Sequence, residues 1–303
     1  MNENKAKSKL IDHSLAVFTI LIWGVTFIST KVLSEYFSSL EILFIRYLAA
    51  YASLWVICPK WLKFSSAKQE AYFIAAGISG ATLYQYLENL SITYTSPASV
   101  SFITALAPIF TTIFARIFLK EKLNFGILLG MLVSLAGVFF ISFGDSKMIE
   151  TGLRGDLIIF CSVWLWAVYS VIVKKIAAFG YPGFLVTRRI FFYALIALLP
   201  AMLTRLDTID FRAIASPVCL MNFAFLGVFA SAICFMTWNR SVDRLGAIVT
   251  SKYLFVMPVI TLIGQVIYDR GTIGSTAILG MALILAGLAL SQIGSGIKKH
   301  PSP

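Results

Sequence analysis

The chain has 303 residues, of which 59% are hydrophobic and only 13% are charged. Soluble globular domains keep roughly 25% of their residues charged, so this composition excludes a soluble protein and indicates an all-α protein that crosses a membrane repeatedly. The formal net charge of +11 does not indicate a nucleic-acid partner, because basic residues in a membrane protein report first on which loops face the cytoplasm.

Apolar stretches follow one another along the chain after a polar tail over residues 1–13, and each is long enough to cross a hydrocarbon core about 30 Å thick. The first stretch ends without a small-residue cleavage site, so we expect it to be retained and not removed as a signal peptide. The ten predicted transmembrane helices cover residues 14–33, 40–58, 71–91, 97–117, 124–143, 156–175, 184–204, 218–238, 246–268 and 273–293.

Basic residues are distributed unevenly between the loops. With ten helices, the loops on the side of the N-terminus hold three times as many Lys and Arg residues as the loops on the other side. Positive loops face the cytoplasm. We therefore expect a multi-pass protein of the cell membrane (a plasma or bacterial inner membrane) with both termini in the cytoplasm.

The two halves of the sequence are related by an internal repeat. Each half holds five predicted helices, over residues 14–143 and 156–293, and an odd number of helices forces the two halves into opposite orientations. Inverted repeats are typical of carriers whose site lies near the middle of the bilayer. Shifts of 143 and 150 residues align Trp23 with Trp166, Arg46 with Arg189, Gly77 with Gly227, Asn89 with Asn239, and Pro108 with Pro258.

Two of these aligned residues interrupt their helices. Pro108 lies in the middle of the fourth predicted helix and Pro258 in the middle of the ninth. A proline frees a backbone carbonyl, which the membrane interior tolerates where neighbouring helices or a cavity supply partners. We interpret both prolines as helix breaks beside the path of a transported solute.

Several motifs of the first half resemble the EamA-like branch of the drug/metabolite transporter superfamily. They are W-G-V-T-F-I-S-T-K from Trp23, F-I-R-Y from Phe44, A-L-A-P-I-F-T from Ala105 and L-K-E-K-L from Leu119. The second half departs from the pattern, with Asp269-Arg270-Gly271 where the L-K-E-K element would stand. The resemblance implies a ten-helix exporter of small metabolites and leaves the metabolite open.

Lys252 and Glu88 lie inside the predicted helices and have no charged counterpart in the repeat. Lys252 aligns with Phe102, and Glu88 aligns with Trp238, so the symmetric scaffold requires neither charge. We expect Lys252, about 9 Å below the cytoplasmic surface, to face a cavity and to bind an anionic group such as an amino-acid carboxylate. The alternatives are a lysine that snorkels to the surface and an interfacial role for Glu88.

Other charged residues are better explained by structure. Arg46 and Arg189 are repeat mates, which favours a structural role for both. Candidate partners for Arg46 on the outer side are Glu41, Glu88 and Lys31. At the inner face the basic residues outnumber the acids, of which Asp243 is the only one nearby in the sequence, so we expect a positive vestibule that attracts anions.

Aromatic side chains form a further group of candidate substrate-binding residues. Trp23, Tyr84 and Trp166 fall near the middle of their helices, where an indole or phenol needs a polar partner or a cavity. Tyr169 and Tyr253 are added as candidates, with a place in the aromatic belts as the alternative. Glycines in the fifth and tenth helices permit close packing inside the bundle or, alternatively, between the protomers of a homodimer.

The sequence lacks the residue patterns that usually indicate an enzyme. The two histidines, His13 and His300, lie in the tails, and the four cysteines show no metal-ligand spacing. We therefore expect no catalytic residues, no metal and no cofactor. The sequence indicates a secondary transporter in the lipid bilayer that exports a small metabolite, such as an amino acid, by alternating access. The alternatives are an uptake carrier and an intramembrane enzyme that acts on lipid-linked substrates.

Overall fold

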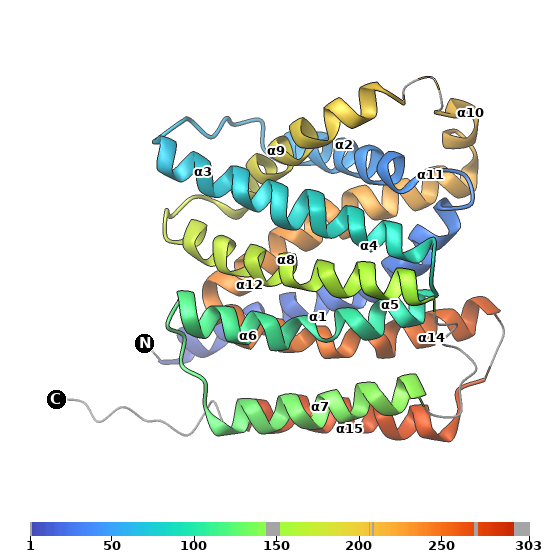
Figure 1. Ribbon diagram of the computed structural model, residues 1–303. Coiled ribbons are helices and arrows are strands. Elements are labelled where there is room, and N and C mark those ends of the chain that lie inside the picture. Colours follow the sequence, from blue (N-terminus) through green and yellow to red (C-terminus); the bar gives the residue numbers. More distant parts are fainter. Residues whose placement is uncertain (1, 144–151, 206, 208, 270–271, 294–303) are drawn as a thin grey trace.

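The computed structural model describes residues 2–143, 152–205, 207, 209–269 and 272–293. Of the residues discussed above, Arg270, Gly271 and His300 lie outside this part of the chain. The described residues form ten rods, each a helix or a run of consecutive helical segments, that lie side by side (Figure 1). Each of the ten predicted transmembrane helices falls in one rod.

The first five rods belong to the first half of the repeat. They are α1 (Asn2–Leu33), α2 (Ser39–Ile57), the run α3 (Ala67–Ala76), η1 (Gly77–Tyr84) and α4 (Gln85–Ile92), the pair α5 (Pro97–Thr104) and α6 (Ala107–Phe118), and α7 (Phe125–Phe143). The other five are α8 (Leu153–Ala177), α9 (Gly183–Leu203), the run α11 (Pro217–Ala224), η3 (Phe225–Ile233) and α12 (Cys234–Leu245), the run α13 (Ala247–Ser251), η4 (Lys252–Val256) and α14 (Met257–Asp269), and α15 (Ser275–Ile293). A short helix, α10 (Phe211–Ile214), precedes α11.

Side-chain caps explain where several rods begin. Ser38 and Glu41 form a capping box at the start of α2, and Ser66 accepts a hydrogen bond from the Gln69 backbone at the start of α3. Ser96 caps α5, with a proline as the first helical residue. These local signals satisfy backbone N–H groups at membrane surfaces, where the rods enter the bilayer.

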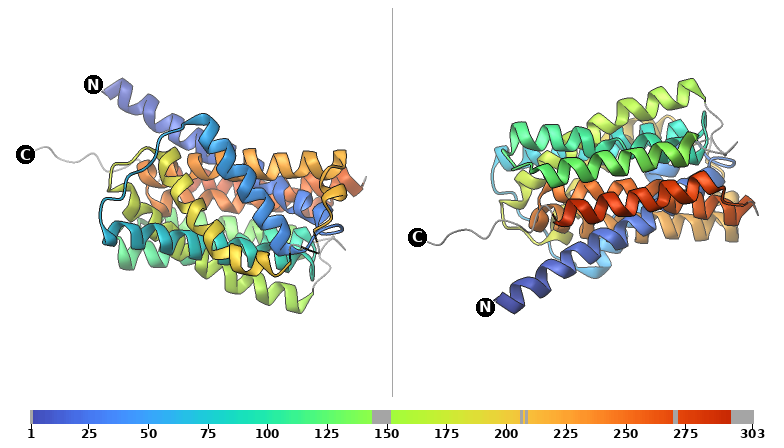
Figure 2. Two further views of the ribbon diagram at one scale, coloured as in Figure 1. Left: turned by 90° about the horizontal axis from the view of Figure 1, so that it is seen from above. Right: turned by 90° about the horizontal axis from the view of Figure 1, so that it is seen from below.

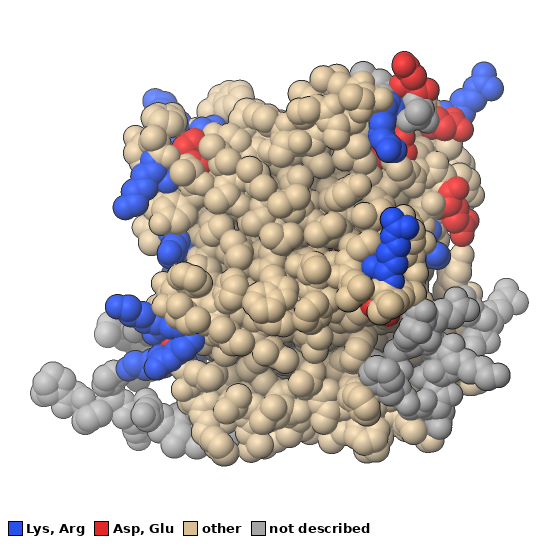
Figure 3. Space-filling model, in the orientation of Figure 1, with Lys and Arg blue, Asp and Glu red and all other residues tan. Residues whose placement is uncertain are grey.

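The start of α1 and the end of α15 lie at the same end of the bundle (Figures 1 and 2). We call this the terminal end and the other the opposite end. In the described part of the chain, seven helices are long and apolar enough to cross a membrane, and α7 and α15 hold shorter apolar segments. The remaining one of the ten rods is the third, which runs from α3 to α4. Charged side chains gather at the two ends on the face shown in Figure 3, and an uncharged belt separates them, as expected for contact with lipid.

Both proline-containing rods are irregular just before the proline. The fourth rod breaks between α5 and α6, ahead of Pro108, and the ninth narrows into the 3₁₀ segment η4 ahead of Pro258. The sequence did not predict that η1 and η3 are π-helical, at nearly equivalent positions of the two halves. Wide π turns often occur at functional sites, and η1 ends directly beside the cavity described below.

The helices α7 and α15 pack closely through their glycines, within one chain. A Cβ atom on Gly137 would lie 2.5 Å from the carbonyl oxygen of Gly280, and one on Gly130 would lie 2.4 Å from that of Gly287. Ser134 adds a hydrogen bond of 3.3 Å to the carbonyl oxygen of Ile284. Packing inside the bundle, one of the two alternatives that the sequence left open, therefore uses these small residues.

Candidate substrate-binding cavity

A small cavity lies between the two halves. Its free space is about 10 Å³, which is room for about one water molecule. The cavity is lined by Trp23, Thr26, Arg46, Tyr84, Gln85, Glu88, Trp166, Leu254 and Met257.

The first half supplies the polar part of this lining. Arg46 comes from α2, Tyr84 ends η1, and Gln85 and Glu88 lie in the first turn of α4. Tyr84 and Glu88 are four residues apart, so they lie on the same face of the helix. From the second half come Trp166 of α8 and the apolar Leu254 and Met257, from the irregular ninth rod.

Arg46 is buried, with 2% of its surface exposed. Its Nε atom donates a hydrogen bond to the Ser231 hydroxyl at 3.0 Å. Its Nη1 atom has no hydrogen-bond partner among the described residues. Leaving a buried donor unsatisfied costs more free energy for a charged guanidinium than for a neutral group. An additional acceptor beside Nη1 would therefore be favourable.

Glu88 faces the same cavity and is 6% exposed. Tyr84 lies one turn earlier on the same face of the helix and lines the cavity beside it. Arg46 and Glu88 do not form a direct ion pair in the described structure. Glu88 is thus buried in the interior of the protein.

Aromatic rings form the wall around these charges. The Trp23 and Trp166 rings meet edge to face at 5.4 Å, and the Tyr84 ring lies 4.8 Å from Trp166. Trp23 donates its indole N–H to the carbonyl oxygen of Ala230 at 2.9 Å, whereas that of Trp166 has no partner in the described chain. The structure thus brings together four of the candidates predicted from sequence: Trp23, Tyr84, Glu88 and Trp166.

Three other candidates lie away from this lining. Tyr169 packs behind Trp166, with ring centroids 5.1 Å apart. Lys252 is 1% exposed, and its Nζ atom lies 6.0 Å from the centre of the Tyr253 ring without a hydrogen-bond partner in the described residues. The Tyr253 hydroxyl contacts His13 at 2.7 Å. A role for Lys252 and Tyr253 in binding substrate stays a prediction.

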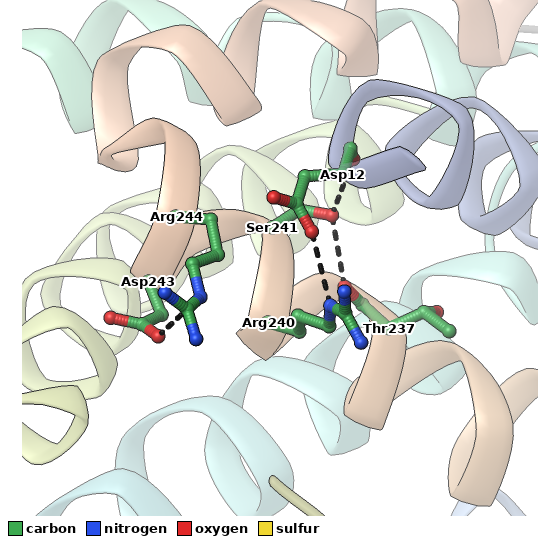
Figure 4. A network of polar contacts seen from close by, with 6 residues as sticks. All are labelled: Asp12, Thr237, Arg240, Ser241, Asp243 and Arg244. Carbon is green, nitrogen blue, oxygen red and sulfur yellow. Dashed lines mark hydrogen bonds and ion pairs between the residues drawn. The ribbon is translucent and has the colours of Figure 1, made fainter. Parts of the chain in front are cut away.

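The terminal end holds more acids than the sequence suggested. Glu70 pairs with Arg189 at 2.6 Å and also accepts a hydrogen bond from Tyr193. Asp12 pairs with Arg240 at 3.0 Å (Figure 4). The expectation that Asp243 is the only acid near these basic residues is therefore wrong, because such partners are more than a hundred residues apart in the chain.

Glu121 makes a third polar link between the halves at the terminal end. Its carboxylate accepts hydrogen bonds from the backbone N–H groups of Ala247 and Ile248, at 2.8 and 3.0 Å. The carboxylate thereby caps the start of α13. Gly246 precedes this helix with φ of 93°, and a side chain there would be both strained and within 3.1 Å of the Glu121 carboxylate. Within the described residues, no three His, Cys, Asp or Glu side chains are grouped as a metal site would require.

Comparison with known proteins identifies the family. A model of the EamA-like transporter family matches residues 11–143 and 153–292. The chain belongs to this family. It is 28% identical over 293 residues to the "Uncharacterized transporter YyaM" of Bacillus subtilis, covering 92% of this chain and 91% of that protein. It is 24% identical over 278 residues to a "Probable terminal-alkyne amino-acid exporter" of Streptantibioticus cattleyicolor, covering 90% and 91%.

The fold agrees with this assignment. A solved crystal structure of another protein, 17% identical, superposes with a TM-score of 0.70 over 97% of this chain and 99% of the other. An EamA-like protein is a multi-span membrane transporter with repeated halves. This EamA-like protein is accordingly a transporter and not an enzyme, as the sequence indicated.

Proposed function

We propose that this transporter exports a small zwitterionic metabolite, such as an amino acid, by alternating access through the cavity between its halves. The observation that carries the proposal is that Arg46, with an unsatisfied donor, and Glu88 line one cavity together with aromatic rings. We place the terminal end in the cytoplasm, because most of the basic loop residues lie there.

The chemistry of the lining matches the two charges of a zwitterion. A guanidinium binds a carboxylate through charge-assisted hydrogen bonds, and Arg46 has a free donor for one. A carboxylate binds an ammonium group, and Glu88 lies across the same cavity. The rings of Trp23, Trp166 and Tyr84 supply an apolar wall for the remainder of the solute.

The architecture supports a carrier that changes conformation. In each half the rod that contains the equivalent proline is irregular, and inverted halves with broken helices suit movement of one half against the other around a fixed site.

Export is proposed over uptake because of one relative, whose printed name is that of an amino-acid exporter. The uptake alternative keeps the same site and reverses the direction of net movement in the cell. A lipid-linked substrate would require a chemical step, and the solute would then emerge changed.

Counterflow in liposomes tests the proposal. Purified protein is reconstituted into vesicles loaded with one unlabelled amino acid after another, and uptake of the labelled form is followed. We expect stimulated exchange for a subset of amino acids, with the label recovered unchanged. Absence of exchange for all zwitterions would contradict the substrate class. The direction of transport is tested in cells that lack the protein: if it exports the amino acid, these cells should grow more slowly on dipeptides rich in that amino acid.

A further inference from the structure

A second pocket, with a volume of about 660 Å³, opens at the terminal end of the bundle. Its walls come from α8, α9 and α12, together with the loop around Pro182. Thr237 and Asn239 lie at its inner side and are buried, whereas Arg240 and Arg244 form an exposed rim. We call it the terminal pocket.

Tyr169 contacts both the lining of the terminal pocket and the lining of the central cavity. The Tyr169 hydroxyl donates a hydrogen bond of 2.9 Å to the Asn239 side-chain oxygen, at the floor of the pocket. The Tyr169 ring also packs against the ring of Trp166, with centroids 5.1 Å apart, and Trp166 lines the cavity. Tyr169 is fully buried and packed so tightly on Gly80 of η1 that a Cβ atom there would lie 2.2 Å from the tyrosine ring.

We propose that the terminal pocket is a loading site for the transported solute and that the Tyr169–Asn239 hydrogen bond is the gate between this site and the central cavity. Breaking the bond and moving the Tyr169 ring joins the two spaces. The ring rests on the π-helical segment η1, whose last residue, Tyr84, lines the cavity. A change of pitch in η1 therefore moves the gate and the cavity wall together.

The inverted repeat offers a comparison at the opposite end. A pocket of about 570 Å³ lies there, and part of its lining consists of residues that the repeat aligns with residues of the terminal pocket. Tyr86 corresponds to Met236, Leu90 to Arg240 and Thr93 to Asp243. Two similar pockets, one at each end, are what alternating access requires.

The gate itself is not repeated. The mates of Tyr169 and Asn239 are Thr26 and Asn89. Thr26 donates to the carbonyl oxygen of Trp23, and the Asn89 side chain has no hydrogen-bond partner in the described structure. Within the described residues, the hydrogen bond between Tyr169 and Asn239 at the terminal end therefore has no equivalent at the opposite end.

The rim indicates which part of the solute the terminal pocket receives. Arg240 and Arg244 are paired with Asp12 and Asp243, but their side chains remain 50% and 66% exposed. Each guanidinium keeps donors for another acceptor. Resting on the proposed function, we assign these arginines to the carboxylate of the arriving amino acid.

An accessibility measurement tests the gate without any knowledge of the substrate. Thr26→Cys places one thiol in the central cavity, in a background in which the four native cysteines are alanine. An impermeant thiol reagent is added from the terminal side. We expect Tyr169→Phe to speed labelling about five-fold, because it removes this one hydrogen bond. Asn239→Ala should speed labelling at least as much, because it also removes the 3.3 Å hydrogen bond that the Asn239 amide donates to Thr187. The double variant should be no faster than Asn239→Ala, since the bond to Tyr169 is already absent there.

Asn89→Ala is the matched control, because it removes the repeat mate of Asn239 without breaking a bond. We expect unchanged labelling from the terminal side. Unchanged labelling in both gate variants, additive effects in the double variant, or equal acceleration by Asn89→Ala would each overturn the gate. The proposal is then wrong even if the protein transports amino acids.

Sided kinetics test the loading site. With the substrate found by counterflow, Arg244→Gln should raise the KM about five-fold for solute presented at the terminal side and leave the KM at the opposite side unchanged. Equal changes on both sides, or none, would remove Arg244 from the loading site. A protein that transports no zwitterion fails the proposed function instead, while the accessibility result still decides the gate.

Discussion

The two halves of this transporter share a scaffold and differ in the chemistry that they bring to its centre. Trp23 and Trp166 are repeat mates, and both line the cavity. Arg46 and Arg189 are also mates, yet Arg46 faces the cavity while Arg189 is paired with Glu70 at the terminal end. The position that corresponds to Glu70 in the second half is Leu220.

This difference explains how one arginine becomes available for binding. Arg189 is paired with an acid whose repeat mate is the apolar Leu220, and Arg46 keeps an unsatisfied donor. Glu88 likewise has a tryptophan as its mate. A zwitterion carries a different charge at each end. A site built from two equivalent halves can distinguish these ends only through residues that differ between the halves.

The largest effect is expected from the arginine pair. Arg46→Gln should lower the kcat/KM for amino-acid counterflow by about ten- to one-hundred-fold, because a charged hydrogen bond contributes about 1.5–3 kcal/mol. Arg189→Gln, the matched variant of its mate, should spare the KM and reduce thermal stability by breaking the pair with Glu70. Equal losses of affinity in the two variants would show that the halves do not differ in this way.

The tryptophan pair should behave alike. Trp23→Ala and Trp166→Ala each remove a ring from the same wall, so the two should raise the KM for solutes with apolar side chains by a similar factor, about tenfold. Glycine, which lacks an apolar side chain, is the control solute and should be affected less. A loss confined to one of the two variants would contradict their equivalence.

A smaller effect is expected at Lys252, which like Glu88 has no charged repeat mate. It lies outside the cavity lining, so Lys252→Met should weaken binding of anionic or zwitterionic solutes by no more than about tenfold. Cationic and neutral solutes serve as the control. Equal losses for all solutes, measured by counterflow, would mean that the residue maintains the fold and does not bind substrate.

The two ends of the bundle should also differ in accessibility. Single cysteines replacing Lys63, in the loop at the terminal end, and Glu35, at the opposite end, are both at exposed positions. An impermeant reagent applied to intact cells should label only the cysteine at position 35. Labelling at position 63 from outside would reverse the proposed orientation.

Much of the fold could be predicted from the sequence because its signals are local. Length and apolarity mark each rod, prolines mark the breaks, and the repeat relates the halves without any tertiary contact. The aromatic candidates could be found by their depth in a helix. Tyr84 and Glu88 reach one cavity because four residues separate them on one helical face.

The rest of the site depends on long-range placement. The repeat favours a structural role for Arg46 because it has a mate, and only the tertiary structure reveals that the mate is held in a direct ion pair while Arg46 is bonded through Nε to the Ser231 hydroxyl. The acids Asp12, Glu70 and Glu121 meet their partners across more than a hundred residues of chain. The π-helical geometry of η1 and η3 likewise has no pattern that distinguishes it from an ordinary apolar helix.

The central claim is that Arg46 and Glu88 read the two ends of a zwitterion, and one panel of solutes tests it directly. Binding is measured for the substrate amino acid, its amine without the carboxylate and its acid without the amine, with the native protein, Arg46→Gln and Glu88→Gln. We predict that Arg46→Gln loses affinity for the amino acid and the acid but not the amine, and that Glu88→Gln loses affinity for the amino acid and the amine but not the acid. Equal losses for all three solutes in both variants would contradict the account.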